Sequence, residues 1–316
     1  MSLEYKISST KRLKSLKSIL KRKSFLRLIE AHNGISALIG QRAQIKTNGK
    51  AIEFDGFWQS SFTDSASKGI PDAEIIGYDS RLETLDDILN VTSKPLLVDG
   101  DTGGTPSQFE YYVKRLESRG VSGIIIEDQK FPKRNSLDRS AKRSLEDPNI
   151  FSKKIERGNA IKLDKDFMII ARIESLICGI GLEDALSRAQ IYIKGGADGI
   201  LIHSIKERPD EVLMFAREYQ KLCHDLNVNI PLVSVPTTYN MITDQQLAAH
   251  GFSIIIHANH LLRAAHKAMQ KAAETILNYD RNFEVNPFCS PVQEISKEVG
   301  FEWIKKQDKQ IRIGSS

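Results

Sequence analysis

The sequence predicts a parallel (β/α)8 barrel of the TIM type, with an extra helix before the barrel and a helical extension after it. The 316 residues are enough for one such barrel, which typically takes about 250 residues. Short apolar runs alternate with longer segments of helical periodicity eight times, which argues for a parallel barrel. An open doubly wound sheet is the alternative. It should carry a GxGxxG turn after an early strand, and the sequence has none.

The apolar runs have the length of strands and are nearly continuous, as strands buried on both faces should be. They lie at residues 26–31, 52–58, 95–99, 123–127, 167–172, 199–203, 231–235 and 253–257. Helical periodicity is found near residues 35–43, 81–93, 107–119, 148–161, 182–194, 209–226, 243–250 and 259–279. We expect a basic N-terminal helix at 1–24, a barrel at 25–280 and a helical extension at 281–316. In this extension, residues 292–309 should form a helix that packs on a neighbouring subunit.

The composition is that of an ordinary globular protein, with 41% hydrophobic and 27% charged residues. No apolar run approaches the roughly 20 residues of a membrane span, and no apolar signal segment opens the chain. Cys178, Cys223 and Cys289 are widely spaced and form no CxxC pair, which indicates reduced thiols rather than disulfides or a zinc site. We therefore expect a cytoplasmic protein that does not enter a membrane.

Much of the net charge of +5 lies near the N-terminus, where lysines and arginines crowd residues 11–23. Leu13, Leu16, Ile19 and Leu20 recur there at helical spacing. Such a helix can bind nucleic acid or an acidic membrane surface. Alternatively, its apolar face packs on the barrel and its basic face is solvated. No aromatic residues are interleaved, as a nucleic-acid surface would often show, so we favour the second interpretation and expect no nucleic-acid partner.

Polar residues follow nearly every predicted strand, at the barrel end where catalytic groups lie. Asp99, Asp101 and Glu127 are hard oxygen ligands from adjacent strands, which suits Mg²⁺. Arg172 and His203 supply positive charge or hydrogen bonds from later strands. Each residue alone has a plainer interpretation, as a loop cap or a core histidine, but their coincidence at one barrel mouth argues against that. The set describes a site for a small anion held between a metal ion and a cationic clamp.

Residues 128–143 are long, polar and basic, and they directly follow one of these strands. Long loops without regular structure in a compact barrel are often active-site lids. This lid would place Lys133 and Asn135 over a bound anion. A solvated excursion of the chain is the alternative.

Six segments resemble, in order, motifs of the isocitrate lyase / phosphoenolpyruvate mutase superfamily. Residues 127–136 read EDQKFPKRNS and resemble the EDKxFPKxNS signature of the phosphoenolpyruvate mutase family. The other five are EAHNGISA at 30–37, LLVDGDTG at 96–103, ARIE at 171–174, GADGILIHS at 196–204 and ANHLLRA at 258–264. They resemble the family patterns EAHNGLSA, LLxDxDTG, ARxE, GADAILxHS and ANHxLRA.

The resemblance implies a (β/α)8 barrel that assembles as a homotetramer or homodimer by swapping C-terminal helices. It implies that the phosphoryl group of phosphoenolpyruvate moves from oxygen to C3, giving phosphonopyruvate, with catalysis mostly by positioning and electrostatic stabilisation. By the same resemblance, Asp99 binds Mg²⁺ directly, whereas Asp101 and Glu127 act through water.

The resemblance also implies roles for residues that contact the small-molecule substrate. The substrate's carboxylate and enolate oxygens would lie against Ser60, Ser61 and the Phe62 backbone. Catalytic roles fall on Asp72, Lys133, Asn135, Arg172 and His203, with Asp72 beside the migrating group and Lys133 and Asn135 closing over it. The remaining substrate-binding residues would be Trp58, Ser136 and Glu174, where Glu174 either orients Arg172 or reaches the metal through water.

The chain departs from the family pattern at four places. Ser61 replaces a glycine, which narrows the space beside the substrate, and Gly104 replaces an aromatic residue. Gln129 replaces a lysine, a form more typical of methylisocitrate lyases. Residues 43–53 resemble an insertion before the second barrel strand. Each change can retune the pocket for a different acid.

Three other functions compete with the mutase. Phosphonopyruvate hydrolases share almost every residue above but tend to carry threonine at the position of Asn135, although Pro71–Ala73 is hydrolase-like. A carbon–carbon lyase of the isocitrate type uses a lid cysteine that this chain lacks. The changes at Ser61 and Gly104 favour a catalytically silent barrel, but a silent barrel has no need to keep the metal-site residues.

Overall fold

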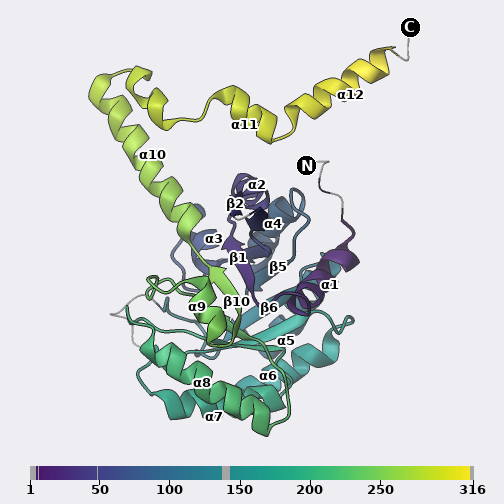
Figure 1. The fold of residues 1–316 in the computed structure, drawn as a ribbon, viewed down its shortest axis with the longest axis vertical. Helices are drawn as coiled ribbons and strands as arrows, with labels where there is room; N and C mark the ends of the chain where they lie inside the picture. Colours follow the sequence, from purple (N-terminus) through teal and green to yellow (C-terminus); the bar gives the residue numbers. More distant parts are fainter. Residues whose placement is uncertain (1–4, 6, 48, 137–142, 314–316) are drawn as a thin grey trace.

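The computed structural model describes residues 5, 7–47, 49–136 and 143–313. Its centre is a closed barrel of eight parallel strands, as the sequence predicts, with the spatial order β1-β10-β9-β8-β7-β6-β5-β4 (Figure 1). The strands are β1 (Leu26–Glu30), β4 (Gly56–Gln59), β5 (Leu96–Asp99), β6 (Gly123–Glu127), β7 (Met168–Ile173), β8 (Gly199–Ile202), β9 (Leu232–Ser234) and β10 (Phe252–His257). Because all of them run the same way, their C-terminal ends meet at one mouth of the barrel.

Helices surround the barrel and bury an apolar layer between themselves and the strands. They are α2 (Gly34–Arg42), α3 (Ser61–Ser67), α4 (Tyr78–Leu89), α5 (Pro106–Ser118), α6 (Pro148–Ile161), α7 (Leu182–Lys194), α8 (Asp210–Asp225) and α9 (Asp244–Ala249). Their starts follow from local sequence. Asn33 and Thr105 form capping boxes at the first turns of α2 and α5, and Pro106 occupies the first turn of α5, where no backbone N–H is needed.

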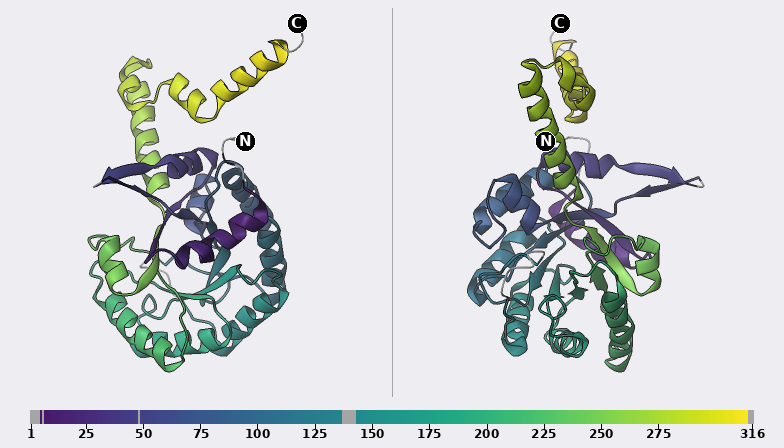
Figure 2. Two further views of the ribbon diagram at one scale, coloured as in Figure 1. Left: turned by 45° about the vertical axis from the view of Figure 1, so that its right-hand side comes forward. Right: turned by 90° about the vertical axis from the view of Figure 1, so that its left-hand side faces the viewer.

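The predicted strand at residues 52–58 is wrong at its start. Residues 44–53 form a separate antiparallel hairpin, β2 (Gln44–Thr47) and β3 (Lys50–Glu53), which projects from the barrel (Figure 2). The barrel strand begins only at Gly56, because Asp55 stays outside β4, where its carboxylate accepts the Arg27 N–H at 2.9 Å. A Cβ at Gly56 would lie 2.7 Å from the Pro95 carbonyl oxygen, so only glycine fits this close approach.

The basic N-terminal helix α1 (Ser9–Leu20) packs against the barrel through its apolar face, as the favoured interpretation expects. Leu13 and Leu16 are buried, and Leu16 contacts side chains inside the barrel, among them Leu26 and Met168. Arg12 is buried too, and its guanidinium donates to the carbonyls of Leu89 and Thr92 at 2.9 and 2.8 Å. The helix therefore closes the end of the barrel opposite the mouth.

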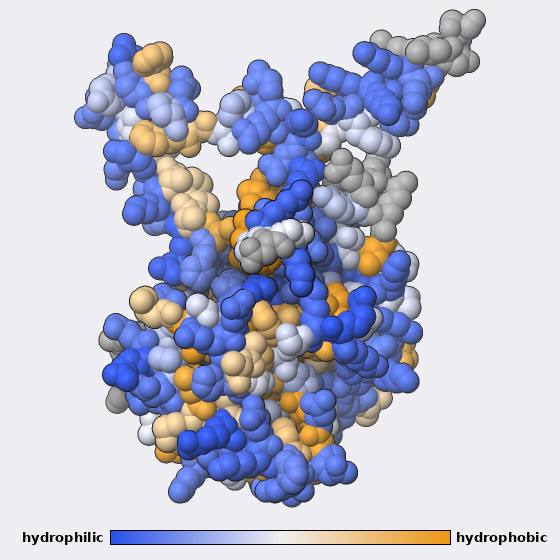
Figure 3. Space-filling view, viewed as in Figure 1, coloured by the Kyte–Doolittle hydropathy of each residue, from blue (hydrophilic) through white to orange (hydrophobic). Residues whose placement is uncertain are grey.

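The C-terminal extension leaves the barrel at its mouth along α10 (His260–Tyr279) and continues as an arm (Figures 1 and 2). The arm contains a 3-10 turn, η1 (Phe283–Phe288), then α11 (Val292–Glu298) and α12 (Phe301–Ile313). The single helix predicted at 292–309 is thus wrong, because Gly300 adopts a φ of +91° and ends the first helix. Figure 3 shows apolar residues along the arm among hydrophilic ones. Its exposed apolar side chains include Leu277, Tyr279, Phe283, Phe288, Val292, Phe301, Trp303 and Ile311.

No helix within the described residues is both long and apolar enough to cross a membrane.

Candidate active site

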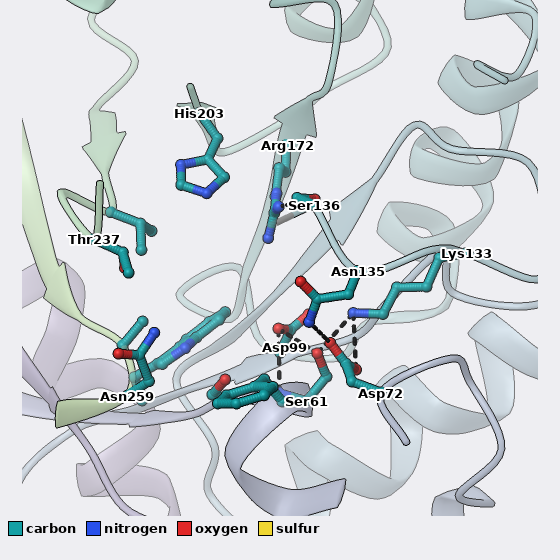
Figure 4. Close-up of a pocket in the computed structure, with 15 residues that line it drawn as sticks. Ser61, Asp72, Asp99, Lys133, Asn135, Ser136, Arg172, His203, Thr237 and Asn259 are labelled. Atoms are coloured by element: carbon teal, nitrogen blue, oxygen red, sulfur yellow. Dashed lines mark hydrogen bonds and ion pairs between the residues drawn. The ribbon is translucent and has the colours of Figure 1, made fainter. Parts of the chain in front are cut away.

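A cavity of about 60 Å³ lies at the mouth of the barrel (Figure 4). Its lining consists of Trp58, Ser60, Ser61, Phe62, Asp72, Asp99, Lys133, Asn135, Ser136, Arg172, His203, Val235, Thr237, Ala258 and Asn259. Most of the predicted site residues are therefore brought together. Asp101, Glu127 and Glu174 do not line the cavity but lie buried behind its wall.

Four lining residues were not among the predicted site residues: Val235, Thr237, Ala258 and Asn259. They follow the last two barrel strands, β9 and β10, at the same mouth. Their position after a strand was one signal, and for Ala258 and Asn259 the family motif at 258–264 was a second. None of them carries a charge, so none is marked as an acid, a base or a metal ligand.

Asp99 is the last residue of β5, and its carboxylate is almost fully buried. One oxygen, Oδ2, accepts hydrogen bonds from the backbone N–H and the hydroxyl of Ser61 at 3.2 and 2.9 Å. Burial alone would raise the pKa of Asp99, but Lys133, Arg172 and Arg81 outweigh it and lower the pKa. Asp99 is therefore ionised at neutral pH.

Lys133 points from the lid into a group of acidic side chains and is 3% exposed. Its ammonium lies 2.7 Å from Asp101 Oδ1 and 3.2 Å from Asp72 Oδ1, and it donates to the Ser61 hydroxyl at 2.7 Å. Burial lowers the pKa of a lysine, but the surrounding carboxylates outweigh that effect and raise it well above its ordinary value. The departure at Ser61 thus places a hydroxyl between Lys133 and Asp99.

Asn135 comes from the same lid and completes this side of the cavity. Its side-chain amide donates to Asp72 Oδ2 at 2.7 Å (Figure 4). Asp72 lies in the irregular segment between α3 and α4, so the lid and that segment meet over the cavity.

Behind the cavity wall, Asp101 and Glu127 are held by arginines. Arg81 of α4 lies 2.8 Å from Asp101, and Arg172 Nη1 lies 3.5 Å from Glu127 Oε2. Burial raises the pKa of both acids, and neighbouring carboxylates add to it, Glu174 and Asp99 at Glu127 and Asp99 and Asp72 at Asp101. The rise is large for Glu127. Glu127 Oε2 is buried and accepts no hydrogen bond from the residues that the structure describes.

Arg172 is fixed by two partners that leave its guanidinium facing the cavity. Its Nε donates to Glu174 Oε1 at 2.6 Å, and its Nη2 donates to the Ser136 hydroxyl at 2.7 Å. That hydroxyl in turn donates to Glu174 Oε2 at 2.7 Å. The structure therefore places Glu174 against Arg172 rather than on the cavity surface.

His203 follows β8 and faces the cavity beside Arg172 (Figure 4). Burial and the nearby arginine lower its pKa to about 3, so the imidazole is neutral at physiological pH. Its Nδ1 is buried and makes no hydrogen bond to the described residues. The ring can therefore give or accept one hydrogen bond without bringing a charge into the site.

The lid predicted at residues 128–143 is described at 128–136 and 143, and residues 137–142 lie outside the described residues. Gln129, one of the four departures, holds the lid through its carboxamide. The NH2 group donates to Glu127 Oε1 at 3.0 Å, to Glu174 Oε2 at 3.3 Å and to the Arg134 carbonyl at 3.1 Å. The carboxamide oxygen accepts the Arg134 N–H at 3.1 Å. A neutral side chain thus joins the two buried glutamates to the lid backbone.

The departure at Gly104 has a structural reason. Its φ is +62°, and a Cβ there would lie 2.8 Å from Gln108 Oε1 and 3.0 Å from the Tyr78 hydroxyl. Tyr78 of α4 stacks on Tyr112 at a ring-centroid distance of 4.0 Å. The ring of Tyr78 therefore lies beside Gly104, the position at which the family carries an aromatic residue.

The donor set fits a hard divalent cation, although the acids do not converge. Within the described part of the chain, no three His, Cys, Asp or Glu side chains are grouped as a metal site. Mg²⁺, however, usually takes one or two carboxylates and completes its shell with water. Asp99 is ionised and lines the cavity, and the buried Glu127 Oε2 lies behind the cavity wall without a hydrogen bond to any described residue. These residues fit an ion bound directly by Asp99.

A closed parallel barrel whose mouth carries paired acids and bases under a polar lid is the arrangement of a TIM-barrel enzyme. The family model described as phosphoenolpyruvate phosphomutase matches residues 16–277. The chain belongs to this family.

The relatives carry different activities. Besides the mutase and the hydrolase described next, they include the 2-methylisocitrate lyase of Escherichia coli (strain K12), which is 31% identical over 278 residues, or 84% of this chain and 83% of the relative. The chain is 35% identical to the phosphoenolpyruvate phosphomutase of Tetrahymena pyriformis over 309 residues, and this alignment covers 98% of each chain. It is 36% identical over 274 residues to the phosphonopyruvate hydrolase of Variovorax sp. (strain Pal2), which covers 86% of this chain and 89% of the relative. A solved phosphonopyruvate hydrolase in complex with oxalate and Mg²⁺ has a TM-score of 0.82 at 34% identity, covering 93% of this chain and 97% of that chain. Identity alone does not separate these activities.

Proposed function

We propose that this protein interconverts phosphoenolpyruvate and phosphonopyruvate as a Mg²⁺-dependent intramolecular phosphotransferase. The observation that carries the proposal is the placement of Asn135, whose amide is held by Asp72 at 2.7 Å over the cavity. Phosphonopyruvate hydrolases tend to carry threonine here. Threonine cannot present a planar amide to a phosphoryl group, so Asn135 favours the mutase.

The reaction breaks the bond between the enolate oxygen and phosphorus and forms a bond between C3 and phosphorus. No proton is needed, and the phosphoryl group never leaves the site. Such transfers pass through a loose transition state, so the protein acts mainly by positioning and by stabilising charge. The residues must hold the phosphoryl group while the enolate turns its carbon toward it, and they must exclude water, which would capture the phosphoryl group as phosphate.

The cationic side chains would perform the first task. The Arg172 guanidinium can hold phosphoryl oxygens two at a time, and Lys133 and Asn135 approach from the lid. Ser60, Ser61 and the Phe62 backbone would bind the carboxylate and enolate oxygens, with Trp58 against the substrate. The neutral His203 supplies a hydrogen bond without repelling Arg172.

Mg²⁺ would be held directly by Asp99 and, through water, by Asp101 and Glu127. When bound, it supplies positive charge that stabilises the oxyanions of substrate and transition state. The similar phosphonopyruvate hydrolase structure, which holds Mg²⁺ and oxalate, supports this assignment.

Phosphonopyruvate hydrolysis is the second candidate, favoured by the 36% identity to a hydrolase and by the hydrolase-like Pro71–Ala73. A carbon–carbon lyase is less well supported, since residues 128–143 contain no cysteine. A silent barrel is disfavoured by the paired acids and bases around the cavity.

The deciding experiment is ³¹P NMR of the purified protein with Mg²⁺ and phosphonopyruvate. The proposal predicts a phosphate-ester signal at the position of phosphoenolpyruvate. A signal of free inorganic phosphate would reject the mutase and support phosphonopyruvate hydrolysis. An unchanged phosphonate signal would reject both activities.

We also propose that the arm packs on a second copy of the chain, giving a homodimer or homotetramer by exchange of C-terminal helices. The support is the exposed apolar side chains of α10, α11 and α12, which a single copy leaves in water. A cytoplasmic location is proposed from the three cysteines, all of which are free thiols. Sedimentation of the purified chain tests the assembly, and a monomer would contradict it.

A further inference from the structure

Glu74 lies between α3 and α4, two residues after Asp72, and is not part of the cavity lining. Its backbone has a φ of +53°, a left-handed conformation that is uncommon for a residue with a side chain. Such a conformation is kept where surrounding contacts hold it, and it is often associated with function. The contacts that hold Glu74 in this conformation are those of its carboxylate.

The Glu74 carboxylate joins three segments that carry the proposed catalytic groups. Its Oε1 accepts hydrogen bonds from the backbone N–H and the hydroxyl of Thr102, at 3.0 and 2.7 Å. Its Oε2 accepts the backbone N–H of Lys133 at 2.7 Å. Thr102 directly follows Asp101, and Lys133 belongs to the lid. One side chain thus ties the lid to the loop after β5 and to its own segment, which carries Asp72.

The contact to the lid is part of a series of backbone contacts along three consecutive residues. Glu74 holds the N–H of Lys133, Gln129 holds both the N–H and the carbonyl of Arg134, and Arg143 donates to the carbonyl of Asn135 at 2.7 Å. Gln129 belongs to the same lid as the residue it holds. Glu74, by contrast, comes from outside the lid, so it can hold the lid against the rest of the barrel.

We propose that Glu74 is a positioning residue that holds the lid closed over the substrate. By fixing the Lys133 backbone, it sets the ammonium between Asp72 and Asp101. By fixing its own segment, it holds Asp72 where Asn135 can bind it. The consequence for turnover rests on the proposed function, whereas the consequence for the lid does not.

Glu74 and Gln129 both hold the lid backbone and can be called its two clamps. Their partners explain why Glu74 is a carboxylate and Gln129 a carboxamide. Arg134 presents one donor and one acceptor, which a glutamine matches. Glu74 faces two backbone N–H groups and a hydroxyl. A glutamine there would turn its NH2 toward a backbone N–H on at least one side, leaving a donor without an acceptor. Glu74→Gln is therefore a nearly isosteric change that should weaken one end of the clamp.

The first test reads the lid directly by limited trypsin digestion of the full chain without substrate. The exposed Arg134 provides a cleavage site inside the lid, and mass spectrometry follows the cut after it. We expect the cut to appear several-fold faster in Glu74→Gln, because the lid opens more often. Glu156→Gln, on an exposed face of α6, is the matched control, and trypsin should cleave it after Arg134 at the same rate as the wild type.

The second test separates positioning from a merely structural role. It measures kcat and KM of Glu74→Gln. The variant loses contacts that the lid makes only when closed, so its kcat should fall by about tenfold or more while its KM changes little. If Glu74→Gln does not fold, Glu74→Asp keeps the charge but shortens the reach, and it should show both effects. Unchanged trypsin cleavage with unchanged kcat would overturn the proposal, as would faster lid cleavage with unchanged kcat. Faster lid cleavage in a protein whose wild type shows no mutase signal supports the clamp and rejects only the proposed reaction.

Discussion

The two sides of the cavity are built from different kinds of residue (Figure 4). The charged wall, on the lid side, consists of Ser61, Asp72, Asp99, Lys133 and Asn135. Thr237 and Asn259 lie on the opposite side. Together with the uncharged lining residues Trp58, Val235 and Ala258, we call them the neutral wall. Arg172 and His203 lie between them.

The charged wall is held together by direct contacts, whereas the neutral wall is shaped by the ends of β4, β9 and β10. Each ionisable group of the charged wall has a partner of opposite charge or a hydrogen bond, which fixes its position before a substrate binds. Preorganised charge of this kind lowers the energy of a transition state. The neutral wall can discriminate only by shape and by single hydrogen bonds. We therefore propose that the reaction depends on the charged wall and substrate choice on the neutral wall.

The largest effect is expected for Asp99→Ala on the charged wall. Without this carboxylate the Mg²⁺ ion loses its proposed direct ligand, and the rate should fall by about 10³-fold or more. The rate is measured by ³¹P NMR and Mg²⁺ binding by calorimetry. Asp225→Ala, whose side chain is 77% exposed, serves as control and should not change either quantity. Retained Mg²⁺-dependent activity in Asp99→Ala would refute the metal assignment.

Asn135→Ala should have the next largest effect. It removes one hydrogen-bonding group from the lid and should lower kcat by about 10²-fold, with the circular dichroism spectrum unchanged. Asn90→Ala, at an exposed position after α4, controls for a general effect of losing an amide. An unaffected rate would take Asn135 out of the mechanism and reopen the hydrolase.

On the neutral wall, Thr237→Val keeps the shape but removes the hydroxyl. We expect KM for phosphoenolpyruvate and for phosphonopyruvate to change by unequal factors, within about tenfold, while kcat stays within about threefold. The neighbouring Thr238, whose hydroxyl donates to the Ser204 carbonyl at 2.8 Å and does not line the cavity, gives the control Thr238→Val. A large loss of kcat in Thr237→Val would contradict the division between the two walls.

The smallest effect concerns stability, through His203 between the walls. Its pKa falls from an ordinary value of 6.5 to about 3 on folding, so the unfolded state binds more protons between these two pH values. The free energy of unfolding should therefore decrease as the pH falls below 6.5, by about 1 kcal/mol between pH 7.5 and 5.5 from this residue. Urea unfolding of His203→Asn should show a correspondingly weaker pH dependence, whereas His224→Asn, at a side chain 91% exposed, should not. Equal pH slopes in wild type and His203→Asn would mean that the imidazole is not held neutral.

The sequence predicted the barrel and the charged wall because both follow from local patterns. Apolar runs mark strands, and the acids and bases that follow them must meet at one mouth. Asp72 was the exception, since it follows no strand and was found only through the family resemblance. Thr237 was missed because a neutral residue after a strand has no chemical signature. Asn259 lies in the family motif at 258–264 but was assigned no role, because it carries no charge. Glu74 was missed because its role depends on which distant loops the fold brings beside it.

The predicted strand at 52–58 failed for a related reason. Periodicity records which residues are apolar but not where the chain turns away from the barrel. The break at Asp55 and Gly56 depends on the neighbouring Arg27 and Pro95, which are far apart in sequence. The arm was misjudged at Gly300, where one left-handed residue divides a helical pattern.

The β2–β3 hairpin directly precedes the first residue of β4, so it stands at the barrel end away from the cavity. The chain can therefore accept a label or a tether in this exposed hairpin without a change at the mouth. An enzyme immobilised through residues 44–53 would present its cavity to the solution, which offers a practical way to hold it on a surface during repeated turnover.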